Sequence, residues 1–140
     1  MSLAHPVILV FDSGLGGLTV LREIQKARPD ARYVYLADNA FFPYGDLPET
    51  VLIDRVVTLI GEMITRHRPD LIVIACHTAS TLVLPALRAA YTTPFIGTVP
   101  AIKPAAETSR SRIIGILATA GTAKRDYTRA LIAEFAGDCK

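Results

Sequence analysis

The sequence has little that would tie the chain to a disulfide framework, a structural metal or a membrane. Its 140 residues include only two cysteines, Cys76 and Cys139, which do not suggest a disulfide-stapled fold. No pair of Cys or His residues has the spacing of zinc ligands. No apolar run approaches the ~20 residues that span a bilayer, and the N-terminus lacks the layout of a signal peptide. We therefore expect a cytoplasmic protein with free thiols.

An excess of charge of one sign is also absent. Lys and Arg number 15 against 13 Asp and Glu, and the formal net charge is +2. The basic residues are scattered rather than clustered, which argues against nucleic acid as a partner. Hydrophobic residues make up 51% of the chain and charged residues 20%, a balance that suits a globular core. The length predicts one domain over residues 1–140.

What is present is an alternation of short apolar runs with longer helical stretches. The runs are nearly continuous, as is typical of strands buried on both faces; they are Val7–Phe11, Arg32–Ala37, Leu71–Cys76, Phe95–Thr98 and Arg112–Ala118. The stretches between them predict helices over Leu18–Ala27, Glu49–His67, Ala79–Tyr91, Ala101–Thr108 and Thr122–Ala136. Right-handed crossovers turn this order into a three-layer α/β/α fold with a five-stranded parallel sheet. We expect the flavodoxin-like strand order 2-1-3-4-5.

Ligands of such sheets bind at the carboxyl ends of the strands. Each expected strand is followed there by small or polar residues, in the segments Asp12–Gly17, Asp38–Gly45, Cys76–Ser80, Val99–Lys103 and Ala118–Thr122. Together these turns offer hydroxyls, backbone N–H groups and one thiol to a common crevice. Because helix N-termini attract anions, we expect a small, polar ligand that carries a carboxylate.

The sharpest single feature is Cys76, which ends a strand directly before a helix. A helix N-terminus favours a thiolate over a thiol, so this residue could act as a nucleophile, a base or a redox group. The alternative is a small buried hydrophobic residue at a strand end. The neighbouring hydroxyls of Thr78 and Ser80 favour the functional interpretation. A Cys-based phosphatase is excluded by Leu82, which stands where the essential arginine would be.

Three other residues each have more than one interpretation. Asp12 is a general base, a partner for an ammonium group or, in its ordinary use, a helix cap. His77 could assist proton transfer by the adjacent thiol, but a backbone-fixing or solvent-facing role fits equally well. Tyr44 either packs within its turn or donates a hydrogen bond to a ligand.

Six segments of the sequence, in order, resemble the glutamate racemases of the Asp/Glu racemase superfamily. They are Phe11–Gly17, Ala37–Asn39, Pro43–Gly45, Ile74–Ser80, Val99–Ala105 and Leu117–Thr122, and they are spread along nearly the whole chain. The resemblance implies interconversion of L- and D-glutamate without pyridoxal phosphate or metal, supplying D-glutamate for peptidoglycan. Two alternatives stay open: a racemase of aspartate or another acidic amino acid, and a non-catalytic module that binds a small anion.

The same resemblance implies roles for individual residues. In these enzymes two cysteines face opposite sides of the substrate Cα, and Cys76 matches the thiol that acts on the D-enantiomer. Asp12 matches an acid close to this thiol. The positions that the resemblance assigns to substrate binding are Ser13, Pro43, Tyr44, Gly45, His77, Thr78, Thr119 and Thr122.

The sequence departs from these racemases in two respects. They normally have asparagine after the catalytic cysteine, where this chain has His77. They also have a second domain with a Gly-Cys-Thr-His motif that carries the opposing thiol, and this sequence has no such motif; Cys139 lacks its context. We therefore expect little or no racemase activity from this chain alone. We also expect an exposed apolar face that causes homodimerisation or poor solubility.

Overall fold

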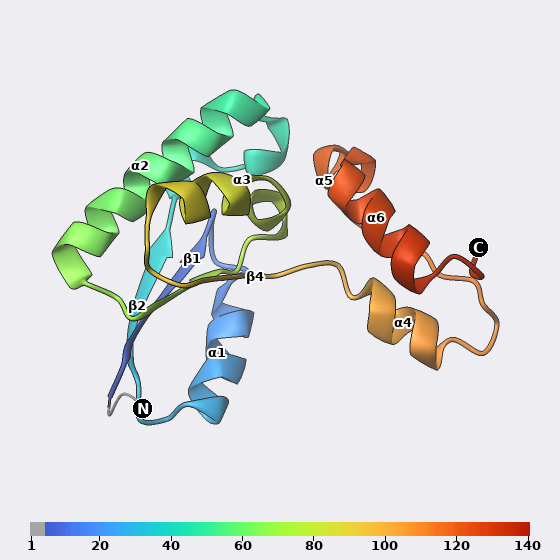
Figure 1. Cartoon of the computed structure of the whole chain (residues 1–140), viewed down its shortest axis with the longest axis horizontal. Helices are drawn as coiled ribbons and strands as arrows, with labels where there is room; N and C mark the ends of the chain where they lie inside the picture. Colours follow the sequence, from blue (N-terminus) through green and yellow to red (C-terminus); the bar gives the residue numbers. More distant parts are fainter. Residues whose placement is uncertain (1–4) are drawn as a thin grey trace.

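The computed structural model describes residues 5–140 and contains a parallel sheet covered by helices on both faces. The four strands are β1 (Val7–Asp12), β2 (Arg32–Ala37), β3 (Leu71–Ile74) and β4 (Phe95–Gly97), in the order β2-β1-β3-β4. Helix α1 (Leu18–Ala27) lies on one face, and α2 (Glu49–His67) and α3 (His77–Ala90) lie on the other (Figure 1). The predicted α/β class and the order of the first four strands are confirmed.

The alternation of side chains along β1 explains why the sheet needs two helical layers. Leu9 and Phe11 pack into the core beneath α2 and α3, while Ile8 and Val10 pack on the opposite face against α1. All four side chains are at most 3% exposed. Burying such a side chain contributes about 1.5–3 kcal/mol relative to leaving it in water. The continuous apolar runs of the sequence therefore reflect strands covered on both sides.

Helix α2 shows how apolar spacing sets the orientation of a helix. Leu52, Val56, Ile60 and Met63 recur every three or four residues, and all four are buried against the sheet. The helix ends at Arg68, whose left-handed backbone (φ 46°) precedes a proline. Within residues 5–140 no helix has the length and hydrophobicity needed to cross a bilayer.

The register of the strands brings their carboxyl ends to one edge of the sheet. Asp12 pairs with Ala37 of β2, and Phe11 pairs with Ile74 of β3. The residues that follow these strands are thus neighbours, although they are far apart in sequence. Two short 3-10 turns, η1 (Asn39–Phe41) and η2 (Tyr44–Asp46), lie between β2 and α2 at this edge.

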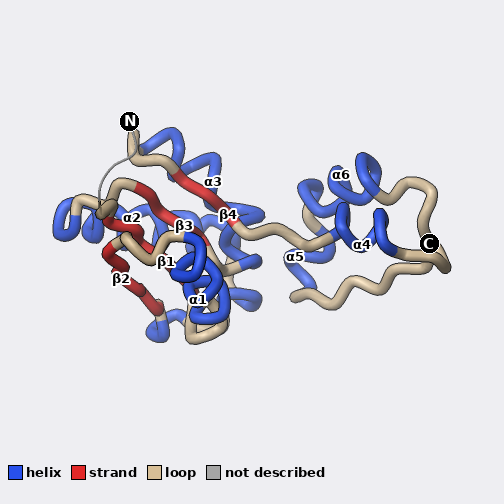
Figure 2. The backbone as a smooth tube through the Cα atoms, turned by 90° about the horizontal axis from the view of Figure 1, so that it is seen from below, coloured by secondary structure: helices blue, strands red, loops and turns tan. Residues whose placement is uncertain are grey.

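Beyond β4 the chain leaves the sheet and forms a second lobe (Figures 1 and 2). This lobe contains α4 (Ile102–Thr108), α5 (Ala120–Lys124) and α6 (Asp126–Phe135). It has a small core of its own, separate from the two clusters around the sheet; its buried members are Ile102, Ala106 and Ala136.

The expected fifth strand over Arg112–Ala118 does not join the sheet, so the prediction of five strands is wrong. The segment lies in the second lobe, and Leu117 is 102% exposed and Ile113 68% exposed. The Lys140 N–H donates to Arg112 O, and the Ile114 N–H donates to Lys140 O, which is one rung of a parallel ladder. Its residues favour a strand, but a strand requires a pairing partner along its length.

The expected helix over Thr122–Ala136 is divided in two. Arg125 has an extended backbone (φ −69°, ψ 144°) between α5 and α6. Helix α5 begins earlier than predicted, because the Thr119 side chain accepts a hydrogen bond from the Thr122 N–H and caps it. The break turns the side chain of Arg125 away from the helix axes and toward α3.

Candidate functional site

Cys76 stands between β3 and α3, where it is the N-cap residue of the helix. Its Sγ lies 3.7 Å from Ser13 Oγ, with the thiol as the donor. The two residues are only 6% and 9% exposed. They meet because β1 and β3 are neighbours in parallel register. The thiol also belongs to the large apolar cluster, so it lies at the boundary between packed hydrocarbon and a polar turn.

Asp12, the last residue of β1, shapes the turn that carries Ser13. Its Oδ2 accepts hydrogen bonds from the N–H of Gly14 at 3.0 Å and of Gly17 at 3.2 Å. A Cβ added to Gly17 would lie 2.7 Å from Asp12 Cβ, so the close approach requires glycine there. Asp12 is 7% exposed and fixes the turn before α1, whose N-cap residue is Gly17.

Tyr44 is buried, and its hydroxyl is already engaged. It donates to Asp38 Oδ2 at 2.6 Å, and burial raises the pKa of this phenol, so it stays a donor. Asp38 also accepts two hydrogen bonds from Arg55, at 2.9 Å from Nε and 2.7 Å from Nη2. These bonds hold the pKa of Asp38 below its usual range against the opposing effect of burial. The Tyr44 hydroxyl is therefore already paired within the protein.

The sequence analysis did not single out Arg55 or Asp38 as site residues. The signal was present, because Asp38 directly follows β2, Asp12 ends β1, and Arg55 is a cation beside the apolar face of α2. The guanidinium carbon of Arg55 also lies 4.4 Å from the centre of the Phe41 ring. Asp38 and Arg55 thus hold Phe41 and Tyr44, two residues of the loop between β2 and α2.

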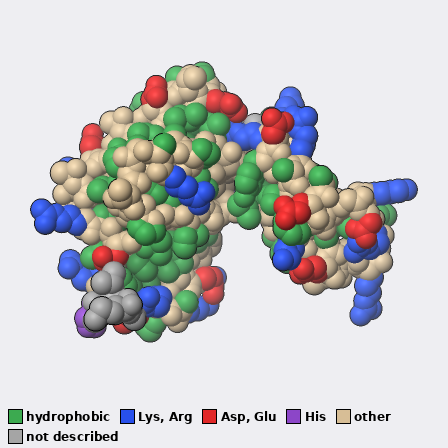
Figure 3. Space-filling view, in the orientation of Figure 1, with side chains coloured by type: hydrophobic (Ala, Val, Ile, Leu, Met, Phe, Trp, Pro, Cys, Tyr) green, Lys and Arg blue, Asp and Glu red, His purple; other side chains and the backbone are tan. Residues whose placement is uncertain are grey.

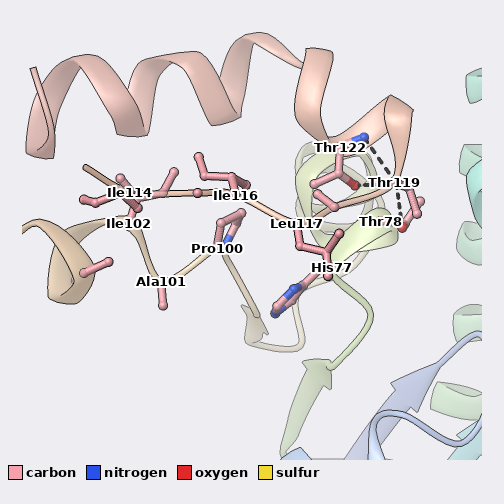
Figure 4. A pocket seen from close by; sticks show the side chains of 13 residues that line it. His77, Thr78, Pro100, Ala101, Ile102, Ile114, Ile116, Leu117, Thr119 and Thr122 are labelled. Carbon is pink, nitrogen blue, oxygen red and sulfur yellow. Dashed lines mark hydrogen bonds between the residues drawn. The ribbon is translucent and has the colours of Figure 1, made fainter. Parts of the chain in front are cut away.

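Three predicted threonines come together from the two lobes. Thr78 Oγ1 in the first turn of α3 lies 3.4 Å from Thr119 Oγ1, which donates to Thr122 Oγ1 at 3.0 Å (Figure 4). Gly45 reaches the same place, since a Cβ added to it would lie 3.1 Å from Thr119 Cγ2. Four of the predicted substrate-binding positions thus meet across the junction of the lobes.

A cavity of about 470 Å³ opens beside these threonines. Thr78 and His77 line it from the first lobe, and Pro100 and Leu117 are among the residues that line it from the second. Hydrophobic side chains gather where the lobes meet (Figure 3). The exposed His77 ring points away from the threonines (Figure 4), and Cys76 does not line the cavity. The predicted residues therefore form two neighbouring groups, one around the thiol and one around the threonines.

Pro43 and the Ser80 hydroxyl lie outside both groups. Pro43 is exposed and follows a cis peptide bond from Phe42. Ser80 Oγ donates to Ile74 O at 2.8 Å and accepts from the Thr98 N–H at 3.0 Å, so it ties β3, α3 and the end of β4 together. Its role in this structure is to hold the helix on the sheet.

Comparison with known proteins places this arrangement in a family. Residues 16–139 match the Asp/Glu/Hydantoin racemase family. The chain belongs to this family. It is 53% identical over 136 residues to a glutamate racemase of Sodalis glossinidius, covering 97% of this chain and 47% of that protein. It is 59% identical over 133 residues to one of Shewanella halifaxensis, covering 95% of this chain and 50% of that protein.

Solved structures agree. The chain superposes with a TM-score of 0.93 and 50% identity on Escherichia coli glutamate racemase in complex with L-glutamate and the activator UDP-MurNAc-ala. That match covers 97% of this chain and 51% of that one, so it includes both lobes and their relative placement. Glutamate racemase from Aquifex pyrophilus matches with a TM-score of 0.76 and 36% identity, over 94% of this chain and 52% of that one. The chain spans about half the length of the curated relatives it matches.

The bidentate pair of Arg55 and Asp38 predicts a measurable contribution to stability. Arg55→Met should lower the free energy of unfolding by about 3 kcal/mol, because it leaves the Asp38 carboxylate buried and unpaired. Urea denaturation at neutral pH measures this loss. In the parent chain the depressed pKa of Asp38 stabilises the fold above the unfolded-state pKa, near 4, and this contribution is lost as pH falls through the folded value. The free energies of unfolding of the parent chain and of Arg55→Met should therefore differ less in acid than at neutral pH.

A matched control is the exposed pair of Arg28 and Asp30, whose side chains are 41% and 43% exposed. Arg28→Met should lower the free energy of unfolding much less than Arg55→Met does, because solvent screens an exposed ion pair. Equal small losses for the two variants would contradict the structural role given to Asp38.

Proposed function

We propose that this chain forms one half of the site of a cofactor-independent glutamate racemase, which interconverts L- and D-glutamate. The observation that carries the proposal is the thiol of Cys76, held at a helix N-terminus against the Ser13 hydroxyl and one turn from the joined threonines. The names of the relatives support glutamate as the substrate. Supply of D-glutamate for peptidoglycan is part of the same proposal.

In this proposal Cys76 exchanges a proton with one face of the substrate Cα. As a thiolate it removes the α-proton of D-glutamate, and as a thiol it returns a proton to the same face of the carbanion. Inversion requires an opposing acid on the other face. Cys139, the second cysteine of these 140 residues, packs against the core of the second lobe and does not face Cys76.

The remaining residues of the proposal bind and orient the substrate. A carbanion beside a carboxylate is stabilised by donors that are already in place. Hydroxyls of Ser13, Thr78, Thr119 and Thr122 and the N-terminus of α3 supply such donors. Asp12 serves as the acid close to the thiol and sets the turn that places Ser13. The backbone of Pro43, Tyr44 and Gly45 and the exposed ring of His77 complete the proposed contacts.

A second candidate, racemisation of aspartate or another acidic amino acid, remains within the family description. The observation that favours this second candidate is His77, because a bulky imidazole at the first residue of α3 changes the space for the substrate. A third candidate is a non-catalytic module for a small anion. The apolar neighbours of Cys76 are the observation in its favour.

Alkylation distinguishes these candidates. Cys139 is more exposed than Cys76, so accessibility alone predicts that Cys139 reacts faster with iodoacetamide. The proposed function predicts the reverse near neutral pH, because the thiolate is the reactive species. D-Glutamate should protect Cys76 and leave Cys139 unaffected, as measured by mass spectrometry of the labelled peptides. Protection by aspartate instead would favour the second candidate. Slow labelling of both thiols without protection would leave only the anion-binding module.

Racemisation by the chain alone should be slower than that of the intact relatives by about 10²–10⁴-fold, the contribution of one acid–base group. Circular dichroism of glutamate solutions measures it. In D₂O, however, the half-site should exchange the α-hydrogen of D-glutamate faster than that of L-glutamate, and Cys76→Ala should abolish the difference. A turnover of L-glutamate close to that of an intact racemase would refute the half-site.

The unpaired segment of the second lobe is proposed to cause homodimerisation. Ile113 and Leu117 are 68% and 102% exposed on an extended backbone, a surface that recruits another chain. Replacing both by serine should reduce self-association in sedimentation velocity at high protein concentration. Leu15→Ser is the matched control, because Leu15 is 68% exposed but lies in a tight turn. A parent chain that stays monomeric would contradict the proposal.

A further inference from the structure

Arg125 is a second-lobe residue whose side chain ends in the first lobe. It lies in the extended break between α5 and α6, and its side chain is only 12% exposed. Its Nη1 donates to the carbonyl of Thr78 and to the hydroxyl of Thr81, both in α3. Its Nε lies 3.4 Å from a carboxylate oxygen of Glu49, the first residue of α2. One guanidinium thus contacts two helices of the other lobe.

The position of these contacts matters because α3 begins beside the thiol. Thr78 is two residues after Cys76, and its hydroxyl faces Thr119 while its carbonyl faces Arg125. The first turn of α3 is therefore held between two parts of the second lobe. The backbone itself connects the two lobes through the segment that follows β4 and leaves the sheet (Figure 2).

The chemistry of the contact suits arginine in particular. A guanidinium has several donors in one rigid plane, whereas the flexible ammonium of lysine is a compact point charge. The Thr81 hydroxyl can serve as the acceptor, because it donates its own proton to carbonyls of the preceding turn at 3.3 Å. Glu49 is 62% exposed, so its ion pair with Arg125 adds little. The bonds to Thr78 and Thr81 are the specific part of the contact.

Arg125 does not line the 470 Å³ cavity at the threonines. It borders a different hollow, together with Glu49, Thr81 and Lys124. A ligand in the cavity would therefore be close to Thr78 and Thr119 without touching the guanidinium. Any effect of Arg125 on such a ligand must pass through the placement of the second lobe against α3.

We infer that Arg125 is a positioning residue that holds Thr119 and Thr122 against the thiol-bearing turn and so sets the affinity for the amino-acid substrate. The inference rests on the proposed function for its ligand. The statement that Arg125 holds the second lobe against α3 depends only on its observed contacts with Thr78 and Thr81.

The test uses Arg125→Met and Arg125→Lys in the whole chain. The first readout is the concentration of D-glutamate that half-protects Cys76 from iodoacetamide. Arg125→Met should raise it about tenfold, as expected for lost hydrogen bonds from a charged donor. Arg125→Lys should rescue part of the loss, because an ammonium still donates to one acceptor. The rate of alkylation without ligand should stay unchanged, because neither variant alters the Cys76–Ser13 contact.

Arg129→Met is the matched control. Arg129 lies four residues further along in the same lobe, and its side chain bonds Lys124 O and Asp126 within that lobe. Arg129→Met should leave the concentration of D-glutamate that half-protects Cys76 unchanged. Thr81→Ala removes one acceptor of Arg125 and should raise the half-protecting concentration by less than Arg125→Met does. In the double variant the two increases should not add fully, because both changes break the same contact.

Hydrogen exchange separates this inference from the proposed function. The Thr122 N–H, bonded to Thr119 Oγ1, should exchange faster in Arg125→Met than in the parent chain or in Arg129→Met. If glutamate fails to protect Cys76 in the parent chain, the proposed function fails. The exchange rate of the Thr122 N–H still tests whether Arg125 holds the second lobe against α3. If Arg125→Met changes neither the exchange nor the half-protecting concentration, the inference is overturned. Equal changes in Arg125→Met and Arg129→Met would also overturn it.

Discussion

Strand β1 lies between β2 and β3 in parallel register, and the arrangement of the candidate site depends on that pairing. Because parallel strands end at the same edge, Asp12, Asp38 and Cys76 become neighbours although they are up to 64 positions apart in the chain. The Asp38 N–H donates to Asp12 O, and the Ala75 N–H donates to Phe11 O, so the backbone ladder continues into the turns. A one-residue slip of β1 would reverse the faces of its side chains and separate the thiol from Ser13.

The polar groups at this edge divide into two kinds of contact. Those of Asp12, Asp38, Tyr44 and Arg55 are engaged with one another or with nearby backbone, which fixes the turns around the thiol. Those of Ser13 and Thr78 are hydroxyls with longer contacts, at 3.7 Å between Ser13 and Cys76 and at 3.4 Å between Thr78 and Thr119. Such groups can exchange their partners for a ligand at little cost. The rigid first group therefore supports an adaptable second group.

The second lobe adds the part of the site that the sheet cannot supply. Thr119 and Thr122 belong to it, and they reach Thr78 only because the lobe is held against α3 and η2. The glycine at position 45 and the arginine at position 125 mark two of the places where the lobes are in contact. Its segment from Ile113 to Leu117 makes one rung of backbone hydrogen bonds with Lys140, and Ile113 and Leu117 stay exposed, because a strand needs a pairing partner along its whole length.

The sequence by itself determined what depends on neighbours along the chain. The helical stretches were predicted at the observed bounds of α1 and α2, and nearly continuous apolar runs predicted four strands of the sheet, because strands covered on both faces bury every side chain. Motif order predicted the family, and the turn before α3 predicted where the thiol stands. Only the tertiary structure decided that Tyr44 donates to Asp38, that residues 112–118 remain outside the sheet, and that Arg125 reaches α3. The contacts of Tyr44 and Arg125 join residues from different elements, which for Arg125 are up to 47 positions apart. No local pattern encodes which distant acceptor a flexible side chain will meet.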